Sequence, residues 1–214
     1  MKQKGILAIV SGFAGSGKGT LMKLLLERHD NYALSISATT RQPREGEQDG
    51  REYFFKTKEE FEEMIRENAF LEYASYVGNY YGTPRFYVEE QLAAGKDVIL
   101  EIEIQGALKV KEMMPETVLI FVTPPDAEEL QKRLVGRGTE TEDVVRARLR
   151  RAVEESEEMS SYDYILVNDD LDETTEQLHA IVQSARFTAD RQAAFSEKIQ
   201  KNLAELTAGF ADER

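Results

Sequence analysis

The sequence of 214 residues contains no cysteine. Disulfide bonds and thiolate metal sites are therefore excluded, and the absence fits a reducing compartment, so we expect a cytoplasmic protein. No apolar run approaches the roughly 20 residues that a membrane-spanning helix needs. The first apolar run, residues 6–10, is too short for the core of a signal peptide, and no small-residue cleavage site follows it. We expect neither a membrane anchor nor a secretion signal.

Positive charge is also scarce. The chain has 27 Lys and Arg residues against 40 Asp and Glu residues, a formal net charge of −13. Such a protein has no general attraction for nucleic acids or anionic membranes, and we expect neither as a partner. Any phosphate that it binds must be held by a local basic site. Histidine occurs twice, as His29 and His179, outside every motif described below, and both are expected to be helix-surface residues.

The strand pattern consists of short apolar runs with many β-branched residues. Continuous apolar runs are typical of strands that are covered on both faces, as in parallel sheets. Helical patterns lie between the runs, which predicts an α/β fold: a doubly wound parallel five-stranded sheet with helices on both faces. The five expected strands are residues 5–11, 32–37, 97–104, 117–123 and 163–167.

The tail from residue 172 onward is expected to be helical. Its apolar residues recur at spacings of three and four, which predicts one apolar helix face that packs on the core or on another subunit. These residues are Phe195, Ile199, Leu203, Leu206 and Phe210.

Two segments interrupt the alternation of strands and helices. Residues 37–85 are rich in Tyr, Phe, Gly and Arg with several turn signals, so we expect an inserted lobe of short strands with one helix near 58–68. Residues 124–160 are highly charged and carry six arginines. They are expected to form a helical lid, and a solvated helical hairpin is the simpler alternative. The remaining segments, residues 1–36, 86–123 and 161–214, would form the core.

The strongest local motif follows the first strand and opens a helix over residues 21–28, the context that a phosphate-binding P-loop requires. Glycines allow a backbone that turns its N–H groups onto a phosphate, and the helix N-terminus adds positive potential. Lys18 would supply a charge for the β- and γ-phosphates of a nucleotide. The motif consists of Gly12, Phe13, Ala14, Gly15, Ser16, Gly17, Lys18, Gly19 and Thr20.

One position departs from the usual P-loop pattern. A hydroxyl residue normally follows the lysine and meets magnesium, but this chain has Gly19 there, and the hydroxyl comes one residue later at Thr20. Thr20 and Glu101 are the candidate residues for Mg²⁺, the expected cofactor, either directly or through water.

Beyond the P-loop, several motifs occur in an order that resembles the guanylate kinase family. The resemblance runs from about residue 5 to residue 169. It implies a kinase that moves the γ-phosphoryl group of ATP to GMP, with ATP and GMP as its small-molecule partners. The segments that carry it are residues 37–44, 46–47, 53–55, 70–72, 78–83, 101–107, 133–138 and 162–169.

The resemblance also implies roles for individual residues. Ser37, Glu72, Thr83 and Glu103 would lie against guanine, and Asn168 would lie near the adenine of ATP. The GMP phosphate would be held by Arg41, Arg44, Tyr53 and Tyr81. The lid arginines Arg133, Arg137 and Arg148 would reach the transferring phosphoryl group, together with Lys18 and Arg41.

These roles are chemically reasonable. Guanidinium groups hold phosphate oxygens with two parallel hydrogen bonds. Guanine presents two donors, N1–H and the 2-amino group, to a carboxylate such as Glu72, whereas adenine lacks both. The family commonly has Asp-x-Asp where this chain has Glu101 and Glu103, and the spacing of two would place both acids on one face of the third strand.

The acceptor phosphate has a second pKa of about 6, so it is largely ionised at neutral pH and no strong general base is needed. We expect direct in-line transfer without a phosphoenzyme. Three alternatives stay open at this point: a kinase for another nucleoside monophosphate, a catalytically inactive guanylate-kinase-like interaction module, and a regulatory GTP switch.

Overall fold

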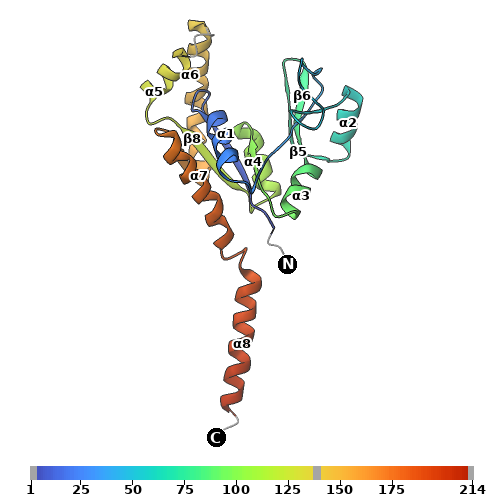
Figure 1. Ribbon diagram of the computed structural model, residues 1–214, viewed down its shortest axis with the longest axis vertical. Coiled ribbons are helices and arrows are strands. Elements are labelled where there is room, and N and C mark those ends of the chain that lie inside the picture. The colour runs from blue at the N-terminus through green and yellow to red at the C-terminus, as the bar shows by residue number, and fades with distance from the viewer. Residues whose placement is uncertain (1–3, 137–140, 212–214) are drawn as a thin grey trace.

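A computed structural model describes residues 4–136 and 141–211 of the chain, and within α8 the side chains up to residue 208. Its main sheet has five parallel strands in the order β2-β7-β1-β8-β9 (Figure 1). This confirms the predicted α/β fold. The strands are β1 (Leu7–Gly12), β2 (Tyr32–Leu34), β7 (Asp97–Glu101), β8 (Val118–Thr123) and β9 (Tyr164–Val167).

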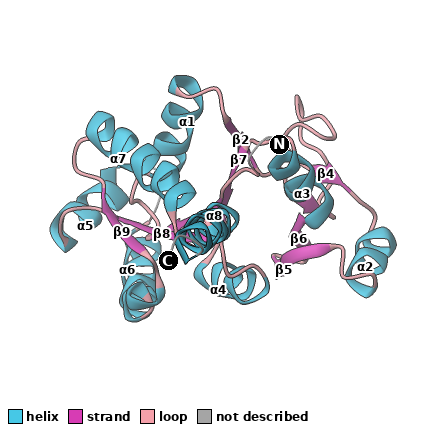
Figure 2. Cartoon of the chain, turned by 90° about the horizontal axis from the view of Figure 1, so that it is seen from below, coloured by secondary structure: helices cyan, strands magenta, loops and turns pink. Residues whose placement is uncertain are grey.

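Helices cover both faces of this sheet (Figure 2). Alternate residues of β1 enter two separate cores, because successive side chains of a strand point to opposite faces. Leu7 and Ile9 pack with residues of α3 (Arg85–Ala93), α4 (Ile104–Met113), α5 (Ala127–Gly136) and α6 (Glu142–Glu157). Ala8 and Val10 pack with α1 (Lys18–Arg28) and α7 (Leu171–Ser184). The central strand is therefore buried on both sides.

A second, mixed sheet stands apart from the first and falls within residues 37–85. Its strand order is β4-β3-β6-β5, and α2 (Lys58–Arg66) covers it. Thr57 caps α2 in a capping box with Glu60. The core of this lobe is small, with Ala38, Phe61 and Phe70 as its buried residues. The strands are β3 (Ala38–Thr39), β4 (Phe54–Phe55), β5 (Phe70–Tyr76) and β6 (Asn79–Pro84).

Two expected strands are shorter than predicted. The run at 32–37 is a strand only to Leu34. The run at 97–104 ends as a strand at Glu101, because Glu103 is the N-cap of α4 and Ile104 is its first residue. The expectation that Glu101 and Glu103 share one strand face is therefore wrong. Ile104 is apolar because the first turn of α4 buries it, so it extends the apolar run of the strand without belonging to the strand.

The tail forms α7, which packs on the core, and α8 (Ala193–Ala211), which projects away from it (Figure 1). The apolar residues of α8 are largely exposed: Phe195 by 59%, Ile199 by 41%, Leu203 by 56% and Leu206 by 62%. Packing of this face on the core is therefore wrong. The side chain of Phe210 lies outside the described residues, and a contact with another subunit stays a prediction.

The two histidines are not isolated surface residues. The rings of His29, after α1, and His179, on α7, stack with centroids 3.7 Å apart and an angle of 4°. The Tyr32 hydroxyl lies 2.9 Å from His179 Nδ1. Burial and the neighbouring His29 lower the pKa of His179. This pair joins the two helices on one face of the sheet, which no sequence spacing indicated.

Candidate active site

The predicted P-loop joins β1 to α1 at the carboxyl end of the sheet. Gly12, Gly15 and Gly17 have positive φ angles of 144°, 90° and 90°. A Cβ atom on Gly12 would lie 2.0 Å from the Val122 carbonyl oxygen, so only glycine fits between β1 and β8. Gly17 is the N-cap of α1. The loop thus presents the N-terminus of an 11-residue helix, a site suited to an anion.

The side chain of Lys18 contacts the backbone of the P-loop. Its Nζ atom donates to the carbonyl oxygens of Gly12, at 2.7 Å, and Phe13, at 3.0 Å. The ammonium group is half-buried and lies among backbone groups of the loop. The predicted contact of Lys18 with a nucleotide phosphate stays a prediction.

Asn168 supports the loop from behind. It is 4% exposed, and its side-chain amide donates to the Ser16 carbonyl oxygen at 2.7 Å. A Cβ atom on Gly17 would lie 2.4 Å from the same amide nitrogen. Asn168 therefore fixes the loop geometry from the end of β9, and its predicted contact with ATP stays a prediction.

A cavity of about 430 Å³ opens in front of the P-loop. Lys18 and Glu101 line it, and so does Arg148 from α6, in the segment predicted to form a lid. Thr20, the other predicted magnesium residue, is an exposed residue in the first turn of α1 and does not line this cavity. Among the residues that the structure describes, no group of three or more His, Cys, Asp or Glu side chains could hold a metal ion.

A second cavity, of about 350 Å³, lies between the lobe and α4. Glu72 on β5 is a partly buried acid in its wall. The Thr83 hydroxyl, itself fully buried, donates to Glu72 Oε1 at 2.6 Å. Burial raises the pKa of Glu72, and the bond from Thr83 opposes that rise. The sequence-predicted residues Ser37, Tyr53, Tyr81 and Glu103 also line this cavity.

Arg41 is already oriented in the lobe. It forms a bidentate ion pair with Glu47, at 3.0 and 2.9 Å, and its guanidinium lies 5.3 Å from the centre of the Tyr53 ring. This pairing lowers the pKa of Glu47. The side chain of Arg44 is exposed, while its backbone N–H donates to Glu47 at 2.7 Å. Glu47 thus ties the two predicted phosphate-binding arginines to one carboxylate, a role that the sequence reasoning missed.

The two cavities are adjacent. Tyr76, Glu101, Ile102 and Glu103 line both of them. The P-loop and the lobe therefore face one crevice at the carboxyl end of β7, the place where ligands bind in open α/β sheets. This is the arrangement on which a transfer between two bound nucleotides depends.

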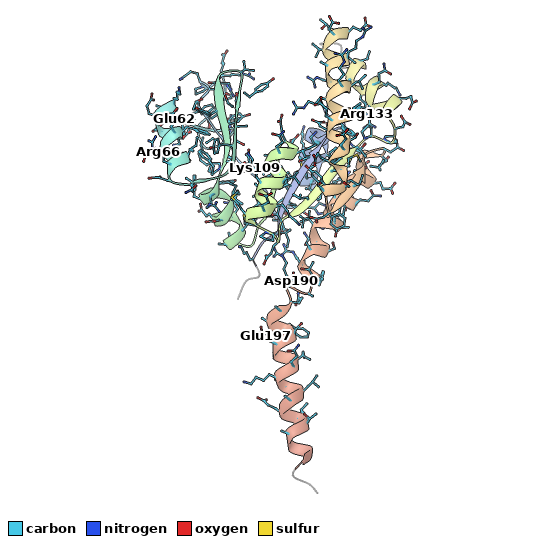
Figure 3. All side chains as sticks on the ribbon, turned by 180° about the vertical axis from the view of Figure 1, so that it is seen from behind. Glu62, Arg66, Lys109, Arg133, Asp190 and Glu197 are labelled. Carbon is cyan, nitrogen blue, oxygen red and sulfur yellow. The ribbon has the colours of Figure 1, made fainter. Side chains whose placement is uncertain are left out.

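The lid arginines occupy different places. Arg148 lines the first cavity with Lys18. Arg133, labelled in Figure 3, donates to Glu129 at 2.8 Å and to the Asn168 carbonyl oxygen at 2.9 Å, so it is tied to the base of the P-loop. Arg137 lies outside the described residues.

Three further residues line the crevice that sequence reasoning did not assign. Tyr76 ends β5, just before the turn at Gly78. Lys109 lies on α4 between the lobe and the lid (Figure 3). Arg151 lies one turn after Arg148 on α6 and lines the first cavity. Two of them have a signal in the sequence: Lys109 lies three residues after Gly106, and Arg151 lies three residues after Arg148, a spacing that places both members of each pair on one helix face.

Comparison with known proteins agrees with this geometry. The sequence pattern described as guanylate kinase matches residues 4–185. A guanylate kinase of Lactococcus lactis is 51% identical over 191 residues, which cover 89% of this chain and 93% of the relative. One of Oceanobacillus iheyensis is 52% identical, with 93% and 97% covered.

A solved structure shows the same likeness in three dimensions. The crystal structure of a guanylate kinase from Anaplasma phagocytophilum aligns with a TM-score of 0.68 at 35% identity, covering 89% of this chain and 90% of that one. Among the described residues, no helix is both long and apolar enough to cross a bilayer.

Proposed function

The chain belongs to the guanylate kinase family, and from this membership we infer that its two adjacent cavities hold the two substrates of one reaction, the transfer of the γ-phosphoryl group of ATP to GMP. The observation that carries the assignment is the shared wall formed by Tyr76, Glu101 and Glu103. Two polyanions bound on either side of it would approach each other in one crevice.

ATP would occupy the P-loop side. The backbone N–H groups of residues 12–17 and the N-terminus of α1 would hold its phosphates, and Lys18 would neutralise the β- and γ-oxygens. Arg133 and Asn168 would support this loop through their bonds at its base. The donor site is thus formed mainly by backbone groups that are in place before the nucleotide arrives.

GMP would occupy the lobe side. Glu72 would accept hydrogen bonds from N1–H and the 2-amino group of guanine, with Ser37, Thr83 and Glu103 beside the base. Its phosphate would be held by Arg41, Arg44, Tyr53 and Tyr81. Adenine has neither donor, so it would leave the Glu72 carboxylate with only its bond from Thr83. Sites of this kind discriminate by up to about 10⁴–10⁵-fold against a ligand that lacks the partner group.

The donor set around the crevice fits Mg²⁺ that arrives with ATP. Magnesium is usually held by one or two carboxylates together with substrate phosphates and water, so the absence of a three-acid cluster among the described residues is compatible with it. Glu101, which lines the cavity, would hold it, directly or through water. Thr20 does not line the cavity, and its contact with the ion stays a prediction from the sequence. When bound, the ion neutralises phosphate charge.

Transfer would be direct. Several cations lie along the crevice: Lys18 and Arg148 line the first cavity, and Arg41 lies in the lobe. Such groups stabilise the charge of a transferring phosphoryl group. Residues 124–160 would act as a lid that brings in Arg133, Arg137 and Arg148 and excludes water, which would otherwise hydrolyse ATP.

The cytoplasmic location of the protein stays a prediction from the sequence.

The test is a coupled ADP-release assay with ATP, magnesium and each nucleoside monophosphate in turn. We expect turnover with GMP and at least about 10³-fold lower kcat/KM with AMP and CMP, because these bases lack the donors that Glu72 would accept from guanine. Equal turnover with AMP would contradict the assignment of Glu72, and ATP consumption without any acceptor would contradict the proposed exclusion of water.

A further inference from the structure

We propose that Arg151 is a positioning residue that holds Glu103 against the acceptor cavity and thereby couples acceptor binding to the lid helix α6. The proposal rests on the proposed function, since it takes the second cavity as the GMP site. No role in the reaction was assigned to Arg151 from the sequence.

Arg151 lies between two carboxylates. Its Nη2 atom is 2.9 Å from Glu103 Oε1, and its Nε atom donates to Glu155 Oε1 at 2.9 Å. Glu155 is four residues further along α6 and its side chain is 19% exposed, so it anchors the arginine to its own helix. The pKa of Arg151 is raised, chiefly by Glu103. An arginine flanked by two acids brings little net positive charge to a phosphate, which favours a positioning role over a catalytic one.

Glu103 needs such a partner. It is the N-cap of α4, its side chain is 75% exposed, and it lines both cavities. A free glutamate of this kind samples many rotamers, and ordering it on ligand binding costs free energy. The bond from Arg151 uses Oε1 and leaves Oε2 as an acceptor for guanine or ribose donors. Glu103 would therefore be oriented before GMP arrives.

The same bond joins the acceptor side to the lid. Arg148 and Arg151 are three residues apart on α6, so they lie on one helix face, and both line the cavity at the P-loop. A GMP molecule that holds Glu103 in place strengthens its bond to Arg151 and favours the α6 position that keeps Arg148 at the crevice. Such coupling is reciprocal, so a loss of Arg151 must weaken GMP binding.

The experiment is a double-mutant cycle in the full-length chain, with Arg151→Ala, Glu103→Gln and the double variant. Arg151→Ala should raise the KM for GMP by about two- to fivefold, the effect of one partly exposed ion pair, with the KM for ATP unchanged. The double variant should resemble Glu103→Gln alone, because the two residues act as a pair. Arg151→Lys should give an intermediate KM, since lysine keeps the charge but cannot bridge both acids.

Arg146→Ala is the matched control. Arg146 also pairs with an acid four residues away on α6, Glu142 at 2.7 Å, and the variant should leave both KM values unchanged. Additive effects in the cycle, or a fall in kcat with KM for GMP unchanged, would overturn the proposal and make Arg151 a phosphate ligand. Glu72→Gln distinguishes a failure of the proposed function from a failure of the role of Arg151. If this variant changes neither the KM for GMP nor the KM for ATP, the proposed function fails. If Glu72→Gln raises the KM for GMP but Arg151→Ala does not, only the role of Arg151 fails.

Discussion

The donor and acceptor sides of the crevice are built in different ways. The P-loop is a backbone structure on a sheet that is buried on both faces, with two large cores beneath it. The acceptor lobe is a side-chain structure on a small sheet with three buried core residues. Its binding groups are themselves held by side chains, Glu72 by Thr83 and Arg41 by Glu47. The comparison indicates that donor binding depends on the whole fold, whereas acceptor binding depends on a few local contacts.

The largest expected effect tests the independence of the lobe. Phe61 is fully buried and stacks on Phe70 and Tyr80, with centroids 4.3 and 5.2 Å away. Phe61→Ala should cost about 3–5 kcal/mol of local stability. Because the lobe has its own core, GMP binding should be lost while ATP binding is kept. Calorimetric titration with each nucleotide measures both.

Phe121→Ala is the matched variant in the main core. Phe121 is also fully buried, and it contacts Phe13 in the P-loop with centroids 5.0 Å apart. This variant should weaken the binding of both nucleotides and lower the free energy of unfolding of the whole chain. If Phe61→Ala abolished ATP binding to the same degree, the two regions would be one cooperative unit.

The next effect tests the donor side. Lys18→Ala should lower kcat by at least about 10²–10³-fold, because a charge aimed at the transferring phosphate is lost. The circular dichroism spectrum and melting temperature should stay close to those of the parent chain, since Lys18 is only partly buried and donates to the carbonyl oxygens of Gly12 and Phe13 in the loop. Lys23→Ala, on the exposed side of the same helix, is the control, and its kcat should be unchanged.

Glu72→Gln tests whether Glu72 recognises the guanine base on the acceptor side. We expect a rise in the KM for GMP of about 10–100-fold with the KM for ATP nearly unchanged, because the amide cannot accept both guanine donors. The melting temperature should not fall, since the variant replaces a partly buried carboxylate of raised pKa by a neutral group of the same shape. Steady-state kinetics and thermal unfolding measure these effects. Glu67→Gln, an exposed lobe residue, should change neither, and equal rises in both KM values would argue against base recognition.

The smallest expected effect is on the pH dependence of stability, through His179 on α7. The pKa of His179 is lowered in the folded state, chiefly by burial and next by His29. Above about pH 6.5, both folded and unfolded chains carry neutral His179. As the pH falls below that value, the unfolded chain binds the proton first, so the contribution of His179 to stability is lost. His179→Gln should therefore show a weaker fall of melting temperature than the parent chain between about pH 7.5 and 5.5. An identical slope would contradict this account.

The same contrast explains what could be predicted from the sequence. The five strands and the P-loop were predictable, because apolar runs and glycine spacing are local signals of buried strands and of a phosphate loop. The position of Glu103 at the start of α4 could not be predicted, because an apolar residue such as Ile104 fits equally well in a buried strand and in the buried first turn of a helix. The stack of His29 on His179 and the bond from Arg151 to Glu103 join residues far apart in the chain. One sequence contains no local signal for such pairs.

The way in which the lobe is attached has a mechanical consequence. It is inserted between β2 and β7, two neighbouring strands, so one link leaves the sheet at residues 35–37 and the other returns through α3. The Tyr87 hydroxyl on α3 donates to the Leu34 carbonyl oxygen at 3.4 Å, which holds the two links side by side. A body joined at two close points turns most easily about the line between them. The lobe would therefore rotate about one hinge axis that passes through these two links.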